Sequence, residues 1–198
     1  MNLRPLPRRF YARDSIDLAG DLVGRLLVRE AGGVRVVGRI VEAEAYRPDD
    51  PASHSFRGPT RRNATMFAGP GLAYVYISYG MHHCMNVTAG GGAAVLLRAL
   101  EPVEGLEEMA RRRGVADVRL LCSGPGRLCQ ALGISLADDG SDLVTGGALW
   151  LAPGAPAETV VVSTRIGITT AVEQPWRFTE AGSRFLSRPV SPSSRPRS

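Results

Sequence analysis

The amino-acid sequence predicts one mixed α/β domain. Its 198 residues fit a single domain that can bury a sizeable core. Segments with the alternating pattern of strands, such as 34–46 and 72–87, are interspersed with helix-like segments such as 16–29. No internal repeat and no second core is visible in the sequence. We therefore expect a single folded unit, with a polar arm at residues 1–12 and a low-complexity, disordered tail at 187–198.

The first predicted helix spans residues 16–29. Leucines at 18, 22, 26 and 27 recur at helical spacing, and Asp14-Ser15 supplies side chains that can cap its start. Gly32-Gly33 then ends the helix.

The next segment, residues 34–46, alternates and is rich in Val and Ile, so it predicts a strand. On a regular strand one face would carry Ile40, Glu42, Glu44 and Tyr46, and the other Val41, Ala43 and Ala45. A long loop, residues 47–65, follows and is dense in turn residues and arginine. Loops of this length inside a compact domain are often functional.

The second half of the chain predicts further strands and two helices. Residues 72–87 form a predicted hairpin with Tyr79-Gly80 near its tip, and 94–100 a predicted strand. Residues 101–114 predict a helix whose acidic residues come early and whose arginines come late, as the helix dipole favours. A short helix is expected within 123–134, and late strands at 148–152, 158–168 and 175–182.

The charge composition limits the chemistry that this chain can perform. The net charge is +5 with a pI near 9.6, which suits a polyanionic partner. All 24 basic residues are arginine, so no lysine side chain can form a Schiff base. Any removal of a base from a nucleotide must therefore use water, unless the terminal amine intervenes. The three cysteines have neither zinc-ribbon nor CxxC spacing, and we expect buried thiols in a cytosolic protein.

Glu42 and Glu44 are the first candidates for catalysis. A carboxylate at the end of a strand that opens into a loop can hold and deprotonate a water. Alternatively, one or both glutamates could be solvated or paired with the loop arginines. A two-carboxylate glycosidase arrangement is a further alternative. However, same-face neighbours on a strand lie only about 7 Å apart, and nothing places a sugar between them.

Aromatic residues near these glutamates suggest a pocket. Tyr46, Tyr76 and His54 could form its walls, although strand aromatics usually serve packing. Tyr79 at a hairpin tip has little core to pack against and could fill the gap left by an extracted base. Asn86 and Arg98 follow on the next strands. The plainer interpretation of Asn86 is a strand-end or turn residue, and that of Arg98 is a surface charge. In the loop, Arg57, Arg61 and Arg62 could form a phosphate-contacting stripe, although basic loops are common.

Several blocks in order resemble the alkyladenine (3-methyladenine, methylpurine) DNA glycosylases. The blocks are EAEAY, the following His, YVYISYGMHHCMN, VLLRALEP and CSGPGRLCQALGI, and the likeness runs from about residue 10 to 185. It implies a catalytic domain at 1–186 around a curved antiparallel sheet, with flanking helices and a protruding hairpin. By position, Glu44 matches the general base and Arg98 a residue beside the catalytic water. The flipped base would lie against Tyr46, His54, Tyr76 and Asn86, and Tyr79 would intercalate.

The resemblance also implies the reaction and its partner. An alkylated or deaminated purine in double-stranded DNA would be flipped out and hydrolysed from its sugar, leaving an abasic site. Neither metal nor organic cofactor would be needed, and we expect a monomer in the bacterial cytosol. His82 and His83 depart from the aromatic residues of mammalian members. Arg127 stands in a segment that contains lysine elsewhere in the family and could keep a charge near phosphate.

The sequence leaves substrates and two other functions open. As substrates, 3-methyladenine, 7-methylguanine, hypoxanthine and ethenoadenine are all compatible with it. A non-catalytic nucleic-acid-binding protein would need Glu44 only for structure. A nucleoside hydrolase would act on free nucleosides, against which the basic loop and the exposed tyrosine tip argue.

Overall fold

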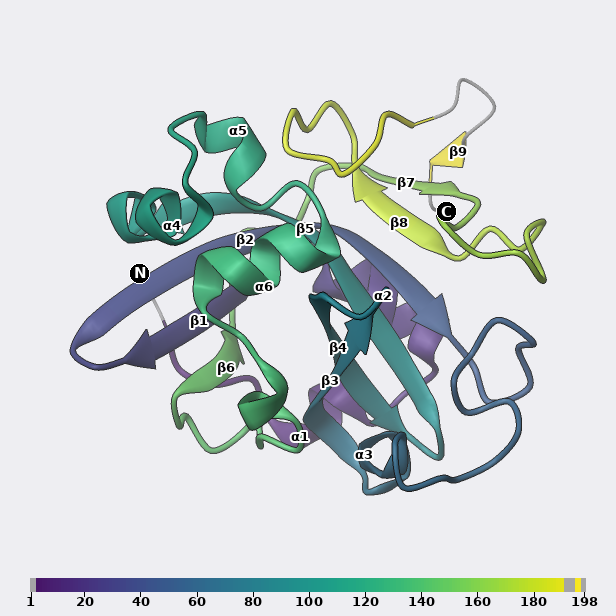
Figure 1. Ribbon diagram of the computed structural model, residues 1–198. Coiled ribbons are helices and arrows are strands. Elements are labelled where there is room, and N and C mark those ends of the chain that lie inside the picture. The colour runs from purple at the N-terminus through teal and green to yellow at the C-terminus, as the bar shows by residue number, and fades with distance from the viewer. Residues whose placement is uncertain (1–2, 191–194, 197–198) are drawn as a thin grey trace.

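A long antiparallel sheet forms the centre of the molecule in the computed structural model, which describes residues 3–190 and 195–196 (Figure 1). The strand order is β3-β4-β5-β2-β8-β7-β9, and β1 pairs with β2 on one side and β6 on the other. The strands are β1 (Leu26–Ala31), β2 (Val34–Tyr46), β3 (Pro70–Ser78), β4 (His82–Gly90), β5 (Ala93–Glu104), β6 (Leu149–Ala152), β7 (Val160–Ser163), β8 (Arg177–Glu180) and β9 (Arg195–Pro196). The sheet curls, and the predicted mixed α/β fold with flanking helices is confirmed.

Strand β2 is the central strand of this sheet, and its bounds are those predicted from the alternation of apolar and polar residues. It pairs with β1, β5 and β8, so both of its edges are hydrogen-bonded. The pairing with β5 is irregular between Ile40 and Glu42, where a β-bulge shifts the register. For this reason Ile40 packs in the same core cluster as Ala43 and Ala45. The expectation that it shares a face with Glu42 was wrong.

The helix predicted at 16–29 is a helix followed by a strand. Helix α2 (Ser15–Leu22) begins at Asp14, whose side chain accepts a hydrogen bond from the Ile16 backbone nitrogen, as expected of a cap. It ends because Gly24 adopts a φ of +93° and the chain enters β1. Leu26 and Leu27 therefore belong to a ladder with β2, and the helical spacing of these leucines was coincidental.

The N-terminal residues that we predicted to form an arm pack onto the domain. Helix α1 (Arg8–Tyr11) buries Tyr11 completely, and Leu6 is also buried. The Leu6 backbone nitrogen donates to the Leu151 carbonyl, which ties this segment to β6. Residues 1–2 lie outside the described part of the chain.

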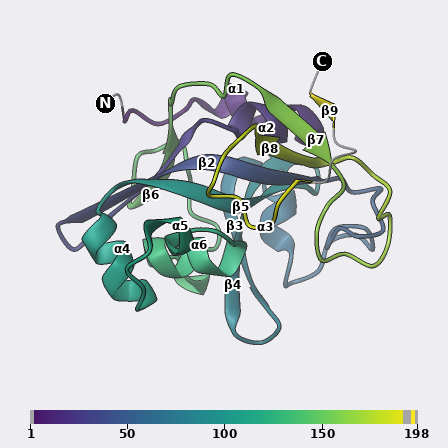
Figure 2. The same cartoon turned by 90° about the horizontal axis from the view of Figure 1, so that it is seen from above.

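Strands β3 and β4 form the predicted hairpin. Ser78 pairs with His82 at its end, and Tyr79 takes a positive φ of 49° in the turn. The tip extends away from the rest of the molecule (Figure 2). Tyr79 is 87% exposed and Met81 is 72% exposed, so the tip presents two large apolar side chains to solvent.

The remaining helices are α3 (Ala64–Phe67), α4 (Leu106–Arg113), α5 (Val118–Leu121), α6 (Pro125–Leu132) and the 3₁₀ turn η1 (Leu136–Asp138). The helix expected at 101–114 starts only at Leu106, because β5 runs on to Glu104 in register with β2. Gly105, with a φ of +76°, makes the change of direction. Within the described residues, none of the helices is long and apolar enough to cross a membrane.

The C-terminal segment differs in part from the predicted tail. The Ser187 backbone nitrogen and hydroxyl both donate to Glu42, and the Arg188 carbonyl accepts from Arg177. These two residues therefore belong to the folded unit. Arg195–Pro196 pairs with β7 as strand β9. The rest of the predicted tail at 191–194 and 197–198 lies outside the described residues.

Candidate active site

The candidate site is built on one row of residues that crosses four strands. Glu44 of β2 pairs with Leu96 of β5, Leu96 with Asn86 of β4, and Asn86 with Tyr74 of β3. Residues directly opposite on neighbouring strands project to the same face of a sheet. The alternate residues of these strands face the other way and form the main core; they are Ala43, Ala45, Ala73, Val75, Met85, Val87, Val95 and Leu97. One face of this sheet therefore serves packing and the other presents the polar row.

Glu44 is fully buried, and its carboxylate accepts three hydrogen bonds. Its Oε1 accepts from the Ile166 backbone nitrogen at 2.7 Å, and its Oε2 accepts from the Tyr46 hydroxyl at 3.1 Å and Arg98 Nη1 at 3.2 Å. Burial raises the pKa of Glu44 above its ordinary value, against the lowering effects of the Arg98 charge and of these hydrogen bonds. Glu44 thus binds a proton more readily than a solvated glutamate does.

Arg98 lies beside Glu44 and is held at each of its nitrogens. In addition to Glu44, its Nη1 donates to the Ile166 carbonyl at 3.4 Å, and its Nε donates to Glu42 at 3.0 Å. Burial acts to lower the pKa of Arg98, but the charges of Glu44 and Glu42 outweigh it and raise this pKa. The alternative that Arg98 is a surface charge is wrong, since its side chain is only 9% exposed.

Glu42 is also fully buried and serves as a structural acceptor. Its Oε1 accepts from Arg98 Nε, from Arg177 Nε at 2.8 Å and from the Ser187 hydroxyl at 2.8 Å. Its Oε2 accepts from the Ser187 backbone nitrogen at 2.6 Å. Neither glutamate is solvated, so that alternative is wrong for both. Glu44 pairs with Arg98, and Glu42 pairs with Arg98 and Arg177; neither pairs with an arginine of the 47–65 loop, which the structure describes in full.

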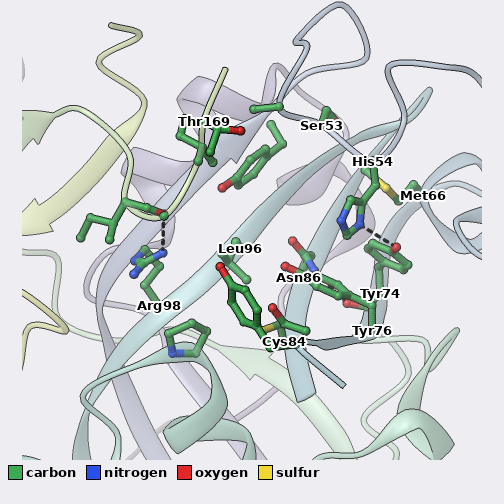
Figure 3. Close-up of a pocket in the computed structure, with 18 of the residues that line it drawn as sticks. Ser53, His54, Met66, Tyr74, Tyr76, Cys84, Asn86, Leu96, Arg98 and Thr169 are labelled. Atoms are coloured by element: carbon green, nitrogen blue, oxygen red, sulfur yellow. Dashed lines mark hydrogen bonds between the residues drawn. The ribbon is translucent and has the colours of Figure 1, made fainter. Parts of the chain in front are cut away.

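A cavity of about 630 Å³ lies in front of this row. Figure 3 shows His54, Tyr74 and Tyr76 on one side of it and Arg98 on the other, with Leu96 between them. Glu44 lies behind the lining, and its partners Tyr46, Arg98 and Ile166 all contribute to the cavity wall. The volume is in the range of small-molecule sites.

The aromatic side of the cavity is a contacting cluster. The His54 and Tyr76 rings lie 4.5 Å apart between centroids at 75°, and Tyr74 and Tyr76 stack at 5.7 Å. His54 Nδ1 shares a hydrogen bond of 3.0 Å with the Tyr74 hydroxyl. Partial burial and the charge of Arg62 lower the pKa of His54, while burial raises the pKa of Tyr74 to about 12. At neutral pH this cluster therefore carries no charge.

Asn86 lines the cavity and is held in one orientation. Its Nδ2 donates to the Tyr74 carbonyl at 3.1 Å, and its side chain is buried in the row between Leu96 and Tyr74. It is therefore neither a strand end nor a turn residue. The Tyr74 carbonyl engages one of the two hydrogens on Nδ2, so the other N–H and the amide oxygen remain to meet a ligand.

Tyr46 is supported from behind by a buried ion pair that our sequence analysis did not identify. Arg165 lies between two rings, with its guanidinium carbon 4.6 Å from the Tyr46 centroid and 4.9 Å from that of Trp176. It is paired through both terminal nitrogens with Asp50, and both side chains are fully buried. This pair joins the 47–65 loop, which carries His54, to the segment that carries Ile166. No sequence pattern indicated it, because the two residues lie 115 positions apart.

The structure places two of the five predicted DNA-facing residues at the cavity. Tyr79 and Arg62 contribute to its lining, and Arg62 Nη2 donates to the Ile77 carbonyl of the hairpin. Arg57 and Arg61 are exposed on the loop outside the lining. Arg127 is exposed near the start of α6, where its Nη1 donates to the Ser123 hydroxyl at 3.0 Å. Sequence reasoning missed Ile166, whose backbone serves the site, and Arg188, which also lines the cavity.

Comparison with known proteins assigns the family. A family model described as "Methylpurine-DNA glycosylase (MPG)" matches residues 9–184. The chain belongs to the methylpurine-DNA glycosylase family. It is thus a DNA glycosylase, a hydrolase of N-glycosyl bonds that acts on DNA, and the resemblance inferred from its sequence blocks is confirmed.

Similar proteins of this glycosylase family come from several bacteria. A protein of Nitrosospira multiformis is 53% identical over 183 residues, which cover 90% of this chain and 92% of that protein. Those of Rubrobacter xylanophilus and Carboxydothermus hydrogenoformans are 52% and 47% identical, over 85% and 92% of this chain and 90% and 98% of their own. All three bear the name "Putative 3-methyladenine DNA glycosylase".

Proposed function

We propose that this glycosylase removes an alkylated or deaminated purine that has been flipped out of duplex DNA. A water activated by Glu44 attacks the sugar and leaves an abasic site on an uncut strand. The observation that carries this proposal is the buried Glu44 carboxylate behind the cavity, surrounded by Arg98 and the Ile166 backbone. Arg98 and Ile166 line the end of the cavity in front of Glu44, and the opposite side of the cavity is aromatic.

The water would lie where Glu44, Arg98 and the Ile166 carbonyl converge. Both acceptors bond to the same nitrogen, Arg98 Nη1, at 3.2 Å and 3.4 Å, so one water beside that nitrogen could donate to the Glu44 carboxylate and to the Ile166 carbonyl. Glu44 takes a proton from this water as its oxygen attacks C1′ of the sugar. The electron pair of the glycosidic bond leaves with the purine. The raised pKa of Glu44 makes it a stronger base, and the Arg98 charge favours its ionised form.

The base would lie between Tyr46 and the rings of Tyr76 and His54. Alkylation at N3 or N7 makes a purine positively charged, which weakens its glycosidic bond and favours contact with tyrosine faces. The uncharged state of the cluster avoids repulsion of such a base. Because His54 Nδ1 bonds to Tyr74, the other ring nitrogen can bond to a base edge. Asn86 lies where it would contact the base and screen purines.

The partner would be double-stranded DNA that contains damaged purines. The exposed Tyr79 would fill the stack that the flipped base leaves, which offsets part of the cost of unstacking. Arg57, Arg61, Arg62 and Arg127 would contact backbone phosphates around the hairpin. The protein would act as a monomer in the bacterial cytosol and use neither a metal nor an organic cofactor.

The decisive experiment measures single-turnover release of 3-methyladenine, 7-methylguanine, hypoxanthine and ethenoadenine from defined duplexes. The Glu44→Gln variant should bind lesion DNA but release base at least about a hundredfold more slowly, because its amide cannot accept the water's proton. A matched control is Glu30→Gln, which makes the same change on an exposed part of β1. The control should release base at the wild-type rate.

Three results would contradict the proposal or a part of it. Wild-type protein that binds duplex DNA but releases none of the four bases would favour a non-catalytic DNA-binding role. Faster hydrolysis of free nucleosides than of duplex DNA would favour a nucleoside hydrolase. Full activity in Glu44→Gln would instead transfer the role of base to another group.

A further inference from the structure

Residues 185–188, which we call the C-terminal latch, return to the active site after β8. The segment is anchored by Phe185, which is buried against Val41 and Ala99 on the strands that carry Glu42 and Arg98. The match to the family model ends at residue 184, just before this segment.

Ser187 forms hydrogen bonds with both Glu42 and Arg98, which are also bonded to each other. Its backbone nitrogen donates to Glu42 at 2.6 Å and its hydroxyl donates to Glu42 at 2.8 Å. The same hydroxyl accepts from Arg98 Nη2 at 3.4 Å. Arg98 is thus held by Glu42, Glu44, the Ile166 carbonyl and Ser187, one of which comes from the latch.

Arg177 fixes the next residue of the latch. Its Nε donates to Glu42 and its Nη2 donates to the Arg188 carbonyl at 2.7 Å, while its side chain is 3% exposed. The backbone is therefore held on both sides of the Ser187–Arg188 peptide. The Arg188 side chain is exposed and lines the cavity. A fixed backbone with an exposed cation at the edge of a cavity suits contact with an anion outside it.

We propose that the C-terminal latch completes the active site. Ser187 is a positioning residue that fixes the orientation of Arg98, and Arg188 binds a DNA phosphate beside the flipped nucleotide. This inference rests on the proposed function, since it takes Arg98 as a partner of the catalytic water. The two roles are separable: Ser187 acts on the chemical step and Arg188 on binding.

Substitutions in the full chain test the positioning role. Ser187→Ala keeps the backbone bond to Glu42 but removes the hydroxyl, so Arg98 Nη2 loses its partner in the latch. We expect the single-turnover release rate to fall about tenfold, within the hundredfold that a misplacement of an ångström can cost. Affinity for lesion DNA and melting temperature should stay near wild type. Ser187→Thr, which restores a hydroxyl, should restore most of the rate.

A second pair of variants tests the phosphate contact. Arg188→Ala should weaken binding to lesion DNA and lower the slope of log affinity against log salt by about one. Arg184→Ala is the matched control, because it removes the same charge from an exposed residue outside the cavity lining. Its salt slope should stay at the wild-type value.

The outcomes separate this inference from the proposed function. If wild-type protein releases no base, the proposed function fails, whatever the variants do. If wild-type protein is active but Ser187→Ala has the wild-type rate, or Ser187→Thr fails to restore it, the positioning role is overturned. Equal salt slopes for Arg188→Ala and Arg184→Ala would overturn the phosphate contact.

Discussion

At the scale of single residues, the environment of Glu44 combines two opposing effects. Complete burial favours its protonated form, while Arg98, the Ile166 backbone nitrogen and the Tyr46 hydroxyl favour the carboxylate. The result is a raised pKa in a group that still has a positive partner. As the proposed general base, Glu44 would be most effective when its pKa lies near the working pH.

This balance predicts the pH dependence of base release. Only ionised Glu44 can accept a proton, so the rate should be high above its pKa and fall as the pH is lowered through it. Because burial raises the pKa of Glu44, the midpoint of this fall should lie above that of an ordinary glutamate. Single-turnover rates for a neutral lesion such as hypoxanthine measure the profile. The residual activity of Glu44→Gln should lack this transition.

Asn86 provides a second prediction at this scale. Its amide is fixed by the Tyr74 carbonyl, so the side chain cannot turn away from a base that carries an extra amino group. We expect Asn86→Ser to raise excision of guanine relative to hypoxanthine by making room for the guanine 2-amino group. Matched duplexes with guanine or hypoxanthine opposite thymine measure this ratio. An unchanged ratio would show that selection lies elsewhere.

The sequence predicted which side chains to consider but not how each is held. Tyr46, His54, Tyr76, Asn86 and Arg98 line one cavity with Glu44 behind it, as their order in the blocks suggested. Ile166 could not be predicted, because its backbone rather than its side chain serves the site. Arg188 was missed because a Ser/Pro/Arg-rich composition is typical of disordered tails.

At the scale of secondary-structure elements, the β3–β4 hairpin is the feature most easily tested. Tyr79 is 87% exposed, and burial of the core does not depend on it. We expect Tyr79→Ala to weaken binding to lesion DNA, because no ring then replaces the flipped base in the stack. Its melting temperature should stay within a few degrees of wild type. A large loss of stability with unchanged affinity would assign Tyr79 to packing instead.

The elements predicted correctly from the sequence are those in which one hydrophobic periodicity continues over many residues. Strand β2 alternates over 13 residues and was predicted with its full length. Residues 16–29 failed because Leu22 and Leu26, four apart, fit a helix although they belong to α2 and β1. Likewise, only long-range pairing with β2 reveals that β5 extends to Glu104. The bulge beside Glu42 could not be predicted for the same reason, because it depends on the pairing with β5.

At the scale of the whole molecule, the absence of lysine constrains the reaction. All 24 basic residues are arginine, so no side chain can form an imine with the sugar. We predict that incubation with lesion DNA and borohydride traps no covalent adduct, and that the strand stays intact until alkali cleaves the abasic site. A bifunctional glycosylase that uses a lysine serves as the positive control. A trapped adduct would implicate the terminal amine and contradict hydrolysis by water.

The row that joins Glu44, Leu96, Asn86 and Tyr74 also fixes the distance between the two ends of the proposed base-binding site. Neighbouring strands lie about 4.8 Å apart, so the positions of Glu44 and Asn86, two strands apart, are separated by about 10 Å. Backbone hydrogen bonds set that length, and no pocket side chain can change it. In the proposed function the water and a two-ring base would fill this span, whereas a single ring would leave Asn86 without contact. We therefore expect alkylated pyrimidines to be released far more slowly than alkylated purines from matched duplexes, because the spacing of the strands sets the size of base that reaches both Glu44 and Asn86.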